Sequence, residues 1–310
     1  MPEPAKQART PVAILGAGLM GHGIAFLFAR AGHTVHVHDR SEAMLESLQA
    51  RVRGICELLG SDATAAGRVI AHAELAPAVA DAGLVIEAVA EDLPVKRAIF
   101  RQLEQLAPPE AILASNTSAL PIGAIGARLQ STHRIVGAHF WNPPHLVPLV
   151  EVVAPDPRTL PAARALCLML KGTGQHAVMI RSDIPGLIGN RLQHALKREA
   201  IALVASGACD AETIDDVVKL GFGARMAVLG PLEQSDLVGL ELTRRIHDVL
   251  MPVLDVTPRT HRYLEELVAR GELGMATGKG FRRWTPESAQ AVRDRLVGQL
   301  VAAARARQAG

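Results

Sequence analysis

The pattern of apolar and polar positions divides the chain into two parts of different character. In the first part, short apolar runs typical of buried parallel strands alternate with segments of helical composition, such as 95–106 and 161–170. This alternation predicts an α/β doubly wound sheet, mostly parallel and covered by helices on both faces, with functional residues at the carboxyl ends of its strands. The predicted strands are 10–15, 34–38, 83–88, 111–114, 135–138 and 175–180.

The second part of the chain has apolar residues at spacings of three and four, which is typical of amphipathic helices. Pro185 and Gly186 separate the two parts, because proline ends the element before it. We therefore expect an α/β domain over residues 1–184 and an all-α C-terminal domain over residues 185–310, with the substrate in the cleft between them. The Ala/Arg-rich tail after Val301 is expected to fray. The predicted helices are 190–205, 210–220, 232–250 and 260–270.

The first predicted strand ends in a glycine-rich turn, Gly16-Ala17-Gly18-Leu19-Met20-Gly21, which leads into an apolar helical segment. Gly16 permits the tight turn, Gly18 lets the backbone approach a pyrophosphate, and Gly21 allows the helix to pack closely on the strand. The N-terminus of the helix attracts phosphate through its free N–H groups and its dipole. The turn, including Leu19 and Met20, is therefore a candidate dinucleotide site; the alternative is an ordinary strand-to-helix turn.

Asp39 stands at the end of the next predicted strand, 23 residues after Gly16. A carboxylate at this place hydrogen-bonds the adenosine ribose hydroxyls and repels a 2′-phosphate, which favours NAD over NADP. Arg40 follows directly and leaves the strictness of that preference open. The order of strand, glycine turn, helix, strand and acid predicts a Rossmann-type fold with NAD as the cofactor.

Polar residues follow the later strands, at the edge where a parallel sheet binds its ligands. Glu91 and Lys96 come after one predicted strand, the segment Ser115-Asn116-Thr117-Ser118 ends the next, and His139 and Asn142 follow a third. These residues are therefore candidates for contact with the cofactor and the substrate.

His139 and Glu151 have the composition of a base and its orienting acid. His139 closes one apolar segment, and Glu151 lies inside the apolar run Leu149-Val150-Glu151-Val152-Val153. An imidazole takes up a proton near neutral pH, and a carboxylate fixes its tautomer and stabilises its cation. The alternative is a core histidine bonded to a backbone carbonyl and a glutamate facing water, because acidic side chains are mostly exposed.

Composition and charge exclude several classes of function. Of 310 residues, 49% are hydrophobic, which supports a large core, and 33 basic against 31 acidic residues give a net charge of only +2. No basic stripe with interleaved aromatic residues is present, so nucleic acid is not expected as a partner. The N-terminus lacks a signal-peptide pattern, and no run of about 18 apolar residues could span a bilayer, so we expect a cytoplasmic protein without membrane contact.

Cysteines and histidines do not indicate a metal site. Cys56, Cys167 and Cys209 are far apart and odd in number, which favours buried thiols in a reducing compartment. His36 and His38 share one face of a predicted strand, but no third ligand is evident. We therefore expect no metal.

With the glycine turn, Asp39, the Ser115–Ser118 segment, the His139–Pro143 segment and Glu151 in this order, the chain resembles the L-3-hydroxyacyl-CoA dehydrogenase family. The resemblance runs from about Thr10 to about Trp284. The segment Pro185-Gly186-Leu187-Ile188-Gly189-Asn190-Arg191 is similar to the start of that family's helical second domain. The resemblance implies an NAD-dependent oxidoreductase that forms a homodimer through its helical domain.

The resemblance also implies roles for individual residues. His139 would be the general base that removes the substrate hydroxyl proton, and Glu151 would orient it. Ser115 and Asn190 would hydrogen-bond the reacting oxygen and place the substrate. The cofactor would contact Gly16, Gly18, Leu19, Met20, Gly21, Asp39, Glu91, Lys96, Ser115 and Asn142.

Two departures from the acyl-CoA enzymes concern the substrate. The span from Asp39 to Glu87 contains no lysine to meet CoA phosphates, although its arginines could bind phosphate. The stretch Gly223–Pro231 is longer than the turn of those enzymes, and is similar to relatives acting on small free acids, such as gulonate, carnitine and pyridine-carboxylate dehydrogenases. Arg225 could then bind a substrate carboxylate; the alternative is a solvated arginine near a helix end.

The leading hypothesis is an NAD-dependent dehydrogenase that acts on a secondary alcohol β to a carboxylate or thioester, with a small 3-hydroxy acid favoured. The first alternative is a short-chain L-3-hydroxyacyl-CoA dehydrogenase, which would place the protein in fatty acid metabolism. The second is a non-catalytic NAD-binding sensor or structural protein. An aldehyde hydrate as substrate would use the same base and hydride geometry, and it also stays open.

Overall fold

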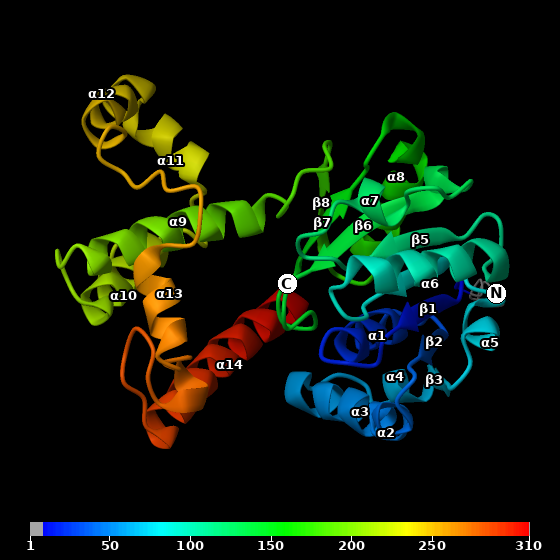
Figure 1. Cartoon of the computed structure of the whole chain (residues 1–310). Helices are drawn as coiled ribbons and strands as arrows, with labels where there is room; N and C mark the ends of the chain where they lie inside the picture. Colours follow the sequence, from blue (N-terminus) through cyan, green and yellow to red (C-terminus); the bar gives the residue numbers. More distant parts are fainter. Residues whose placement is uncertain (1–8, 310) are drawn as a thin grey trace. The chain divides into compact units, whose positions relative to one another are not determined.

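The computed structural model describes residues 9–309, and within them the chain forms two compact units (Figure 1). The first unit comprises the residues up to Asn190 together with those from Val297 onward, and the second comprises Arg191–Leu296.

The first unit is built on one sheet, which has eight strands in the order β3-β2-β1-β4-β5-β6-β7-β8 within the described residues. All neighbouring strands are parallel except β6 and β7, which are antiparallel. The predicted doubly wound, mostly parallel α/β sheet is confirmed. The strands are β1 Val12–Leu15, β2 Val35–His38, β3 Val69–His72, β4 Leu84–Glu87, β5 Ile112–Ser115, β6 Ile135–Phe140, β7 Leu149–Val153 and β8 His176–Ile180.

Helices cover both faces of this sheet, and the alternation of side chains along each strand decides which face a residue serves. On β1, Val12 and Ile14 belong to the apolar cluster that includes residues of α1, α3 and α8, whereas Ala13 and Leu15 belong to the cluster that includes residues of α5, α6 and α7. The bounds are α1 Gly21–Arg30, α2 Glu42–Glu46, α3 Leu48–Leu59, α4 Thr64–Gly67, α5 Leu75–Val79, α6 Leu93–Leu106, α7 Ile122–Ile125 and α8 Leu160–Gly172. The helices lie on the two faces of the sheet (Figure 1), and two apolar clusters fill the space between helices and sheet.

The strand β3 is absent from the sequence prediction. It has four residues at the edge of the sheet, and only Val69 among them is buried. An edge strand with one buried position has neither a continuous apolar run nor a clear alternation, so the sequence pattern does not mark it.

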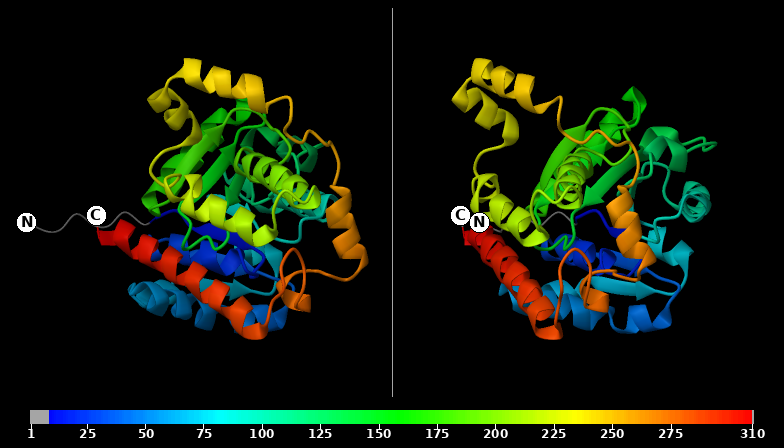
Figure 2. Two further views of the ribbon diagram at one scale, coloured as in Figure 1. Left: turned by 90° about the vertical axis from the view of Figure 1, so that its left-hand side faces the viewer. Right: turned by 60° about the vertical axis from the view of Figure 1, so that its left-hand side comes forward.

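The second unit is helical, as the sequence predicted, but one of its predicted helices is divided. The predicted helix 232–250 is divided into α11 and α12, which are labelled in Figure 1 and coloured yellow in the further views of Figure 2; Gly239 lies between them in the sequence. Gly239 has a φ of 96°, a left-handed value that ends an α-helix and favours glycine. The helices are α9 Gly189–Ala205, α10 Ala211–Leu220, α11 Pro231–Val238, α12 Leu240–Leu250, α13 Arg262–Ala269 and α14 Pro286–Ala309.

The C-terminal half of α14 belongs to the first unit, which corrects the expected domain range of 185–310 and the expected fraying after Val301. Ala304 is buried there, and Leu300 and Val301 pack against the core of the first unit. The Arg305 guanidinium also donates to the Leu58 carbonyl at 2.8 Å. These apolar residues are three and four positions apart, so a helix brings them to one face and their burial stabilises the tail.

The second unit leaves much of its apolar surface open. Within the described chain, none of the helices α9 to α12 buries a side chain, and Leu232 and Leu237 of α11 are 79% and 73% exposed. Among the described residues, no helix has both the length and the apolar content that crossing a membrane requires.

Candidate functional site

His139 and Glu151 contact each other across two strands. The antiparallel register of β6 and β7 places the two residues directly opposite, and the His139 Nδ1 to Glu151 Oε2 distance is 2.8 Å. Both side chains are buried, at 6% and 1% exposed. Directly opposed residues of antiparallel strands have close Cβ atoms, which is why this register makes the pair.

The Glu151 carboxylate accepts three further hydrogen bonds. The Trp141 indole N–H donates to Oε2 at 3.3 Å, and the backbone N–H groups of Ile188 and Gly189 donate to Oε1 at 3.0 Å each. Burial by itself raises the pKa of Glu151, but the hydrogen bonds from His139, Gly189 and Ile188 outweigh it and lower the pKa. The carboxylate is therefore charged and holds the proton of His139 on Nδ1, which leaves Nε2 as the basic nitrogen.

Ser115 lies inside the fold, at the end of β5. Its side chain is fully buried, and its hydroxyl donates to Glu87 Oε2 at 2.6 Å. Lys96 is 1% exposed and donates to both oxygens of Glu87, at 2.7 and 2.9 Å. The resemblance implies Ser115 on the reacting oxygen and the cofactor, and Lys96 along the ribose; in the structure both side chains bond the buried Glu87 carboxylate. Burial of a charge requires such partners.

Glu91 organises the loop that follows β5. Its Oε1 accepts the Thr117 hydroxyl at 2.6 Å and the backbone N–H groups of Ser118 and Ala119 at 2.9 and 3.0 Å. Lys96 Nζ lies 3.3 Å from its Oε2. Burial acts to raise the pKa of Glu91, and the Thr117 hydrogen bond and the Lys96 charge lower it further than burial raises it.

Ser118 is the serine of this loop that faces outward. It is exposed, and its carbonyl accepts the Asn190 side-chain N–H at 3.0 Å. The sequence pattern does not distinguish a serine at the end of a strand, such as Ser115, from a serine in the loop that follows, such as Ser118. Asn142 is likewise exposed, in the loop after β6.

Asn190 reaches this edge of the sheet because Glu151 holds the start of α9. Gly189, the preceding residue, donates to Glu151 and packs against Trp141, where a Cβ would lie 2.3 Å from the ring. The contacts of Glu151 and Ser118 thus connect His139 with Asn190. The predicted catalytic residues His139, Glu151 and Asn190 belong to one network, and the residue of the Ser115–Ser118 segment that joins this network is Ser118.

The glycine turn has the geometry of a phosphate cradle. Gly16 has a φ of 100°, and a Cβ on Gly21 would lie 1.7 Å from the Gly16 carbonyl, so both positions require glycine. No atom lies within 4 Å of the position of a Cβ on Gly18, which leaves open space above the turn. Leu19 is exposed beside it, and Met20 packs on the core.

Asp39 lines a cavity beside the glycine turn, on the side of β2. Its Oδ2 accepts the Ala17 N–H at 2.7 Å, and its Oδ1 accepts the Ser41 N–H at 2.9 Å. The cavity has a volume of about 520 Å³ and includes Gly16, Gly18 and Asp39 in its walls. Its apolar walls and single carboxylate fit the adenosine half of a dinucleotide, whose ribose hydroxyls a carboxylate binds.

Arg51 supports the turn, a role that sequence reasoning missed. Its guanidinium donates to the Ala17 carbonyl at 2.6 Å and to the Met44 carbonyl at 2.7 Å, which joins α3 to the glycine turn. No sequence signal marks this arginine, because it lies on a helix face among other polar residues.

The remaining candidates lie away from this network. His36 on β2 has a histidine neighbour on β3: its Nδ1 lies 2.8 Å from His72 Nε2. Within the part of the chain that the structure describes, no group of three or more metal-ligating side chains could hold a metal ion. Arg225 is an exposed residue of the second unit.

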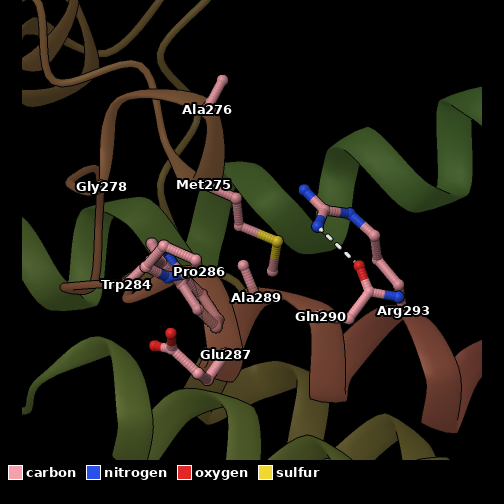
Figure 3. A pocket seen from close by; sticks show the side chains of 9 residues that line it. All are labelled: Met275, Ala276, Gly278, Trp284, Pro286, Glu287, Ala289, Gln290 and Arg293. Carbon is pink, nitrogen blue, oxygen red and sulfur yellow. Dashed lines mark hydrogen bonds between the residues drawn. The ribbon is translucent and has the colours of Figure 1, made fainter.

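The second unit contains a separate hollow of about 720 Å³ beside the start of α14 (Figure 3). Met275, Trp284 and Arg293 are among its walls, and Arg293 donates to the Gln290 amide oxygen at 3.4 Å. None of the predicted catalytic residues lines it, so the acid and base that could move a proton belong to the first unit.

Comparison with family models covers nearly the whole chain. Residues 11–184 match the model described as 3-hydroxyacyl-CoA dehydrogenase, NAD binding domain, and residues 186–284 match 3-hydroxyacyl-CoA dehydrogenase, C-terminal domain.

The relatives of the chain include a dehydrogenase named for a pyridine carboxylate and one named for hydroxyacyl-coenzyme A. The chain is 33% identical to 5-formyl-3-hydroxy-2-methylpyridine 4-carboxylate 5-dehydrogenase of Mesorhizobium japonicum, over 95% of this chain and 97% of that protein. It is 34% identical to human mitochondrial hydroxyacyl-coenzyme A dehydrogenase, over 88% of this chain and 90% of that protein. A solved structure of a 5-formyl-3-hydroxy-2-methylpyridine 4-carboxylic acid 5-dehydrogenase, described as an NAD+ dependent dismutase, has a TM-score of 0.88 at 30% identity and covers 96% of this chain and 98% of that one.

The substitution Glu151→Gln tests the charge of the buried carboxylate. Glutamine keeps an oxygen for the backbone N–H groups of α9 but removes the negative charge beside His139, so we expect a loss of about 1.5–3 kcal/mol of unfolding free energy at neutral pH. Because the folded pKa of Glu151 is lowered, its stabilisation is complete above the ordinary value of about 4.3 and is lost as pH falls through the folded pKa.

Thermal unfolding of the wild type and Glu151→Gln from about pH 3 to pH 7 measures this, with the exposed Glu46→Gln as the control. The stability difference between the wild type and Glu151→Gln is expected to shrink on the acid side. A difference that stays constant over the whole range contradicts a charged Glu151.

Proposed function

The chain belongs to the 3-hydroxyacyl-CoA dehydrogenase family, and from that premise we propose that its NAD-dependent reaction oxidises the secondary alcohol of a small 3-hydroxy acid. The protein is an enzyme that acts on a CH–OH group with NAD. The buried His139–Glu151 pair carries the proposal for the chemistry, because alcohol oxidation requires a base that takes the hydroxyl proton.

In this proposal His139 Nε2 accepts the proton of the substrate hydroxyl. Glu151 holds Nδ1–H at 2.8 Å, so the imidazole presents its lone pair at Nε2, and the carboxylate stabilises the imidazolium that forms. NAD, when bound, supplies the acceptor for the hydride of the carbinol carbon. In the reverse direction the same nitrogen returns the proton to the developing alkoxide.

Ser118 and Asn190 are proposed to hydrogen-bond the reacting oxygen. Support for Ser118 comes from its exposure and from the loop bonds to Glu91, which hold it in a defined position. Asn190 donates to the Ser118 carbonyl, so its amide adjoins the same loop. Ser115 and Lys96 then act indirectly, through Glu87 and Glu91.

We propose that NAD lies along the glycine turn and the ends of β2 and β4. Gly16, Gly18 and Gly21 would admit the pyrophosphate to the N-terminus of α1, and Asp39 would bind the adenosine ribose. Glu91 and Asn142 would lie along the nicotinamide ribose.

Two observations favour a free acid over an acyl-CoA. The span from Asp39 to Glu87 contains no lysine that could meet the phosphates of CoA. The relative from Mesorhizobium is named for a pyridine carboxylate, and Arg225 would bind the carboxylate of such an acid.

The names of two relatives support alternative substrates. The identity to human hydroxyacyl-coenzyme A dehydrogenase supports a short-chain L-3-hydroxyacyl-CoA substrate, which would place the enzyme in fatty acid metabolism. The formyl group in the name of the Mesorhizobium relative supports an aldehyde hydrate, whose hydroxyl proton the same base would take.

We further propose a cytoplasmic homodimer that forms through the helical unit. The exposed leucines of α11 and the absence of buried side chains in α9 to α12 support a second copy as the cover, because a helical unit of this size needs a buried core.

His139→Gln tests the general base. The variant is expected to bind NADH with unchanged affinity and to lose about 10²- to 10⁴-fold in kcat, since it cannot accept the proton. Steady-state kinetics and NADH fluorescence titration measure the two quantities, with the exposed His176→Gln as the control. A kcat near that of the wild type removes His139 from the mechanism.

The pair Ser118→Ala and Ser115→Ala separates the two serines. Ser118→Ala is expected to lower kcat/KM about tenfold with the melting temperature unchanged, because one substrate hydrogen bond is lost. Ser115→Ala is expected to lower the melting temperature, because buried Glu87 loses a donor. If Ser115→Ala alone lowers kcat/KM at unchanged stability, the assignment returns to Ser115.

A thermal-shift comparison tests the substrate class. With NADH present, free β-keto acids are expected to raise the melting temperature more than CoA or acetoacetyl-CoA, and Arg225→Gln is expected to remove that rise. Stabilisation by CoA compounds alone replaces the proposal with the acyl-CoA alternative.

Sedimentation equilibrium of the full chain tests the dimer. The wild type is expected at the mass of two chains, and Leu232→Glu with Leu237→Glu is expected at the mass of one, because a charge in an apolar interface is costly. A wild type at the mass of one chain at micromolar concentration contradicts the proposal.

A further inference from the structure

A second cavity of the first unit lies apart from the cofactor cavity. Its volume is about 360 Å³, and it is bordered by the end of α1, the turn after α8 and the last turns of α14. No residue is shared between its walls and those of the cavity at the glycine turn. The lining residues are Leu27, Arg30, Ala31, His145, Gly172, Thr173, Gly174, Gln175, Ala304 and Arg307.

The side chains that line this cavity carry a net positive charge. Arg30 and Arg307 contribute two guanidinium groups, and no aspartate or glutamate is among the described residues that line the cavity. Among the described residues, neither arginine takes part in an ion pair. Arg30 is half-buried and Arg307 is exposed, and both guanidinium groups border the same cavity. The planar guanidinium fork matches the oxygens of a carboxylate or a phosphate.

Both guanidinium groups are held in place and retain donors. Arg30 donates from Nη2 to the Thr173 carbonyl at 2.9 Å, and its guanidinium lies 5.5 Å from the centre of the Phe26 ring. Arg307 donates from Nη2 to the Leu146 carbonyl at 2.6 Å. A guanidinium has five N–H groups, so one backbone carbonyl on each arginine leaves several donors for an oxyanion.

The ends of α1 and α8 reduce this charge without cancelling it. The C-terminus of a helix carries about half an elementary negative charge. An arginine beside it is therefore stabilised in part by the helix end itself. The C-terminal end of α14 also borders the cavity, so three helix ends offset about one and a half of the two guanidinium charges by this measure, and the net charge stays positive.

Gln175 and His145 complete the polar wall. Gln175 is 8% exposed and donates to the Pro144 carbonyl at 2.9 Å, which fixes the wall beside the arginines. Burial, and secondarily the neighbouring His22, lower the pKa of His145 to about 4, so this imidazole is neutral near pH 7. A neutral imidazole can hydrogen-bond a ligand, and an anion beside it would raise its pKa.

We propose that this cavity is a binding site for a small, multiply charged oxyanion of the phosphate or polycarboxylate kind, held by Arg30 from α1 and Arg307 from α14. The volume is in the range of small-molecule sites and exceeds what one inorganic phosphate fills. Because α1 and α14 are distant in sequence, an anion between their arginines joins the C-terminal turns of α14 to the sheet domain and stabilises the folded state.

The test uses the full chain with saturating NADH, which blocks phosphate binding at the glycine turn. Inorganic phosphate and citrate are titrated in separate thermal-shift series against sodium chloride of equal ionic strength. A saturable rise in melting temperature above the chloride series is expected, and the stronger of the two series identifies the kind of anion. The double variant Arg30→Gln with Arg307→Gln is expected to lose the rise, while Arg305→Gln, which contacts the Leu58 carbonyl outside the cavity, keeps it.

A second measurement remains informative if the double variant folds poorly. The His145 ring is titrated by nuclear magnetic resonance in the wild type with and without saturating phosphate or citrate, and the anion is expected to raise its pKa. The proposal is overturned if chloride stabilises as well as both anions, if the double variant keeps the rise, or if neither anion shifts the titration of His145. These outcomes are independent of the activity of the enzyme.

Discussion

The burial of one carboxylate governs the arrangement of this site. Glu151 is 1% exposed and charged, and a charge taken out of water costs several kcal/mol unless donors replace the water. Its donors come from three places: the His139 ring on β6, the Trp141 ring in the next loop, and two N–H groups at the start of α9. The need to satisfy one charge therefore sets both the tautomer of the base and the position of the helix that carries Asn190.

The same principle recurs at the ends of β4 and β5. Glu87 is buried with Lys96 and Ser115 as donors, and Glu91 accepts two backbone N–H groups of the loop that carries Ser118. Carboxylates at this edge of the sheet thus order loops, which otherwise have few contacts to define them. A base that must meet a substrate oxygen within hydrogen-bond distance depends on loops ordered in this way.

The two units differ in how completely one chain buries their apolar side chains. The sheet of the first unit is enclosed by two apolar layers, and the C-terminal turns of α14 add to one of them. The helices of the second unit expose the apolar faces that their three- and four-residue spacing creates. Amphipathic spacing predicts a helix and its apolar face, but the partner of that face is determined by tertiary or quaternary contacts.

The sequence by itself determined the doubly wound sheet, the glycine turn with Asp39 and the helical second part, and it predicted His139 and Glu151 as a base and its acid partner. These features depend on periodicity and on short motifs whose chemistry is local. Only the tertiary structure decided that Ser115 points inward and Ser118 outward, that Lys96 is buried, and that the tail after Val301 packs on the first unit. Those outcomes depend on register and on burial between residues far apart in sequence, and neither quantity is contained in a local pattern.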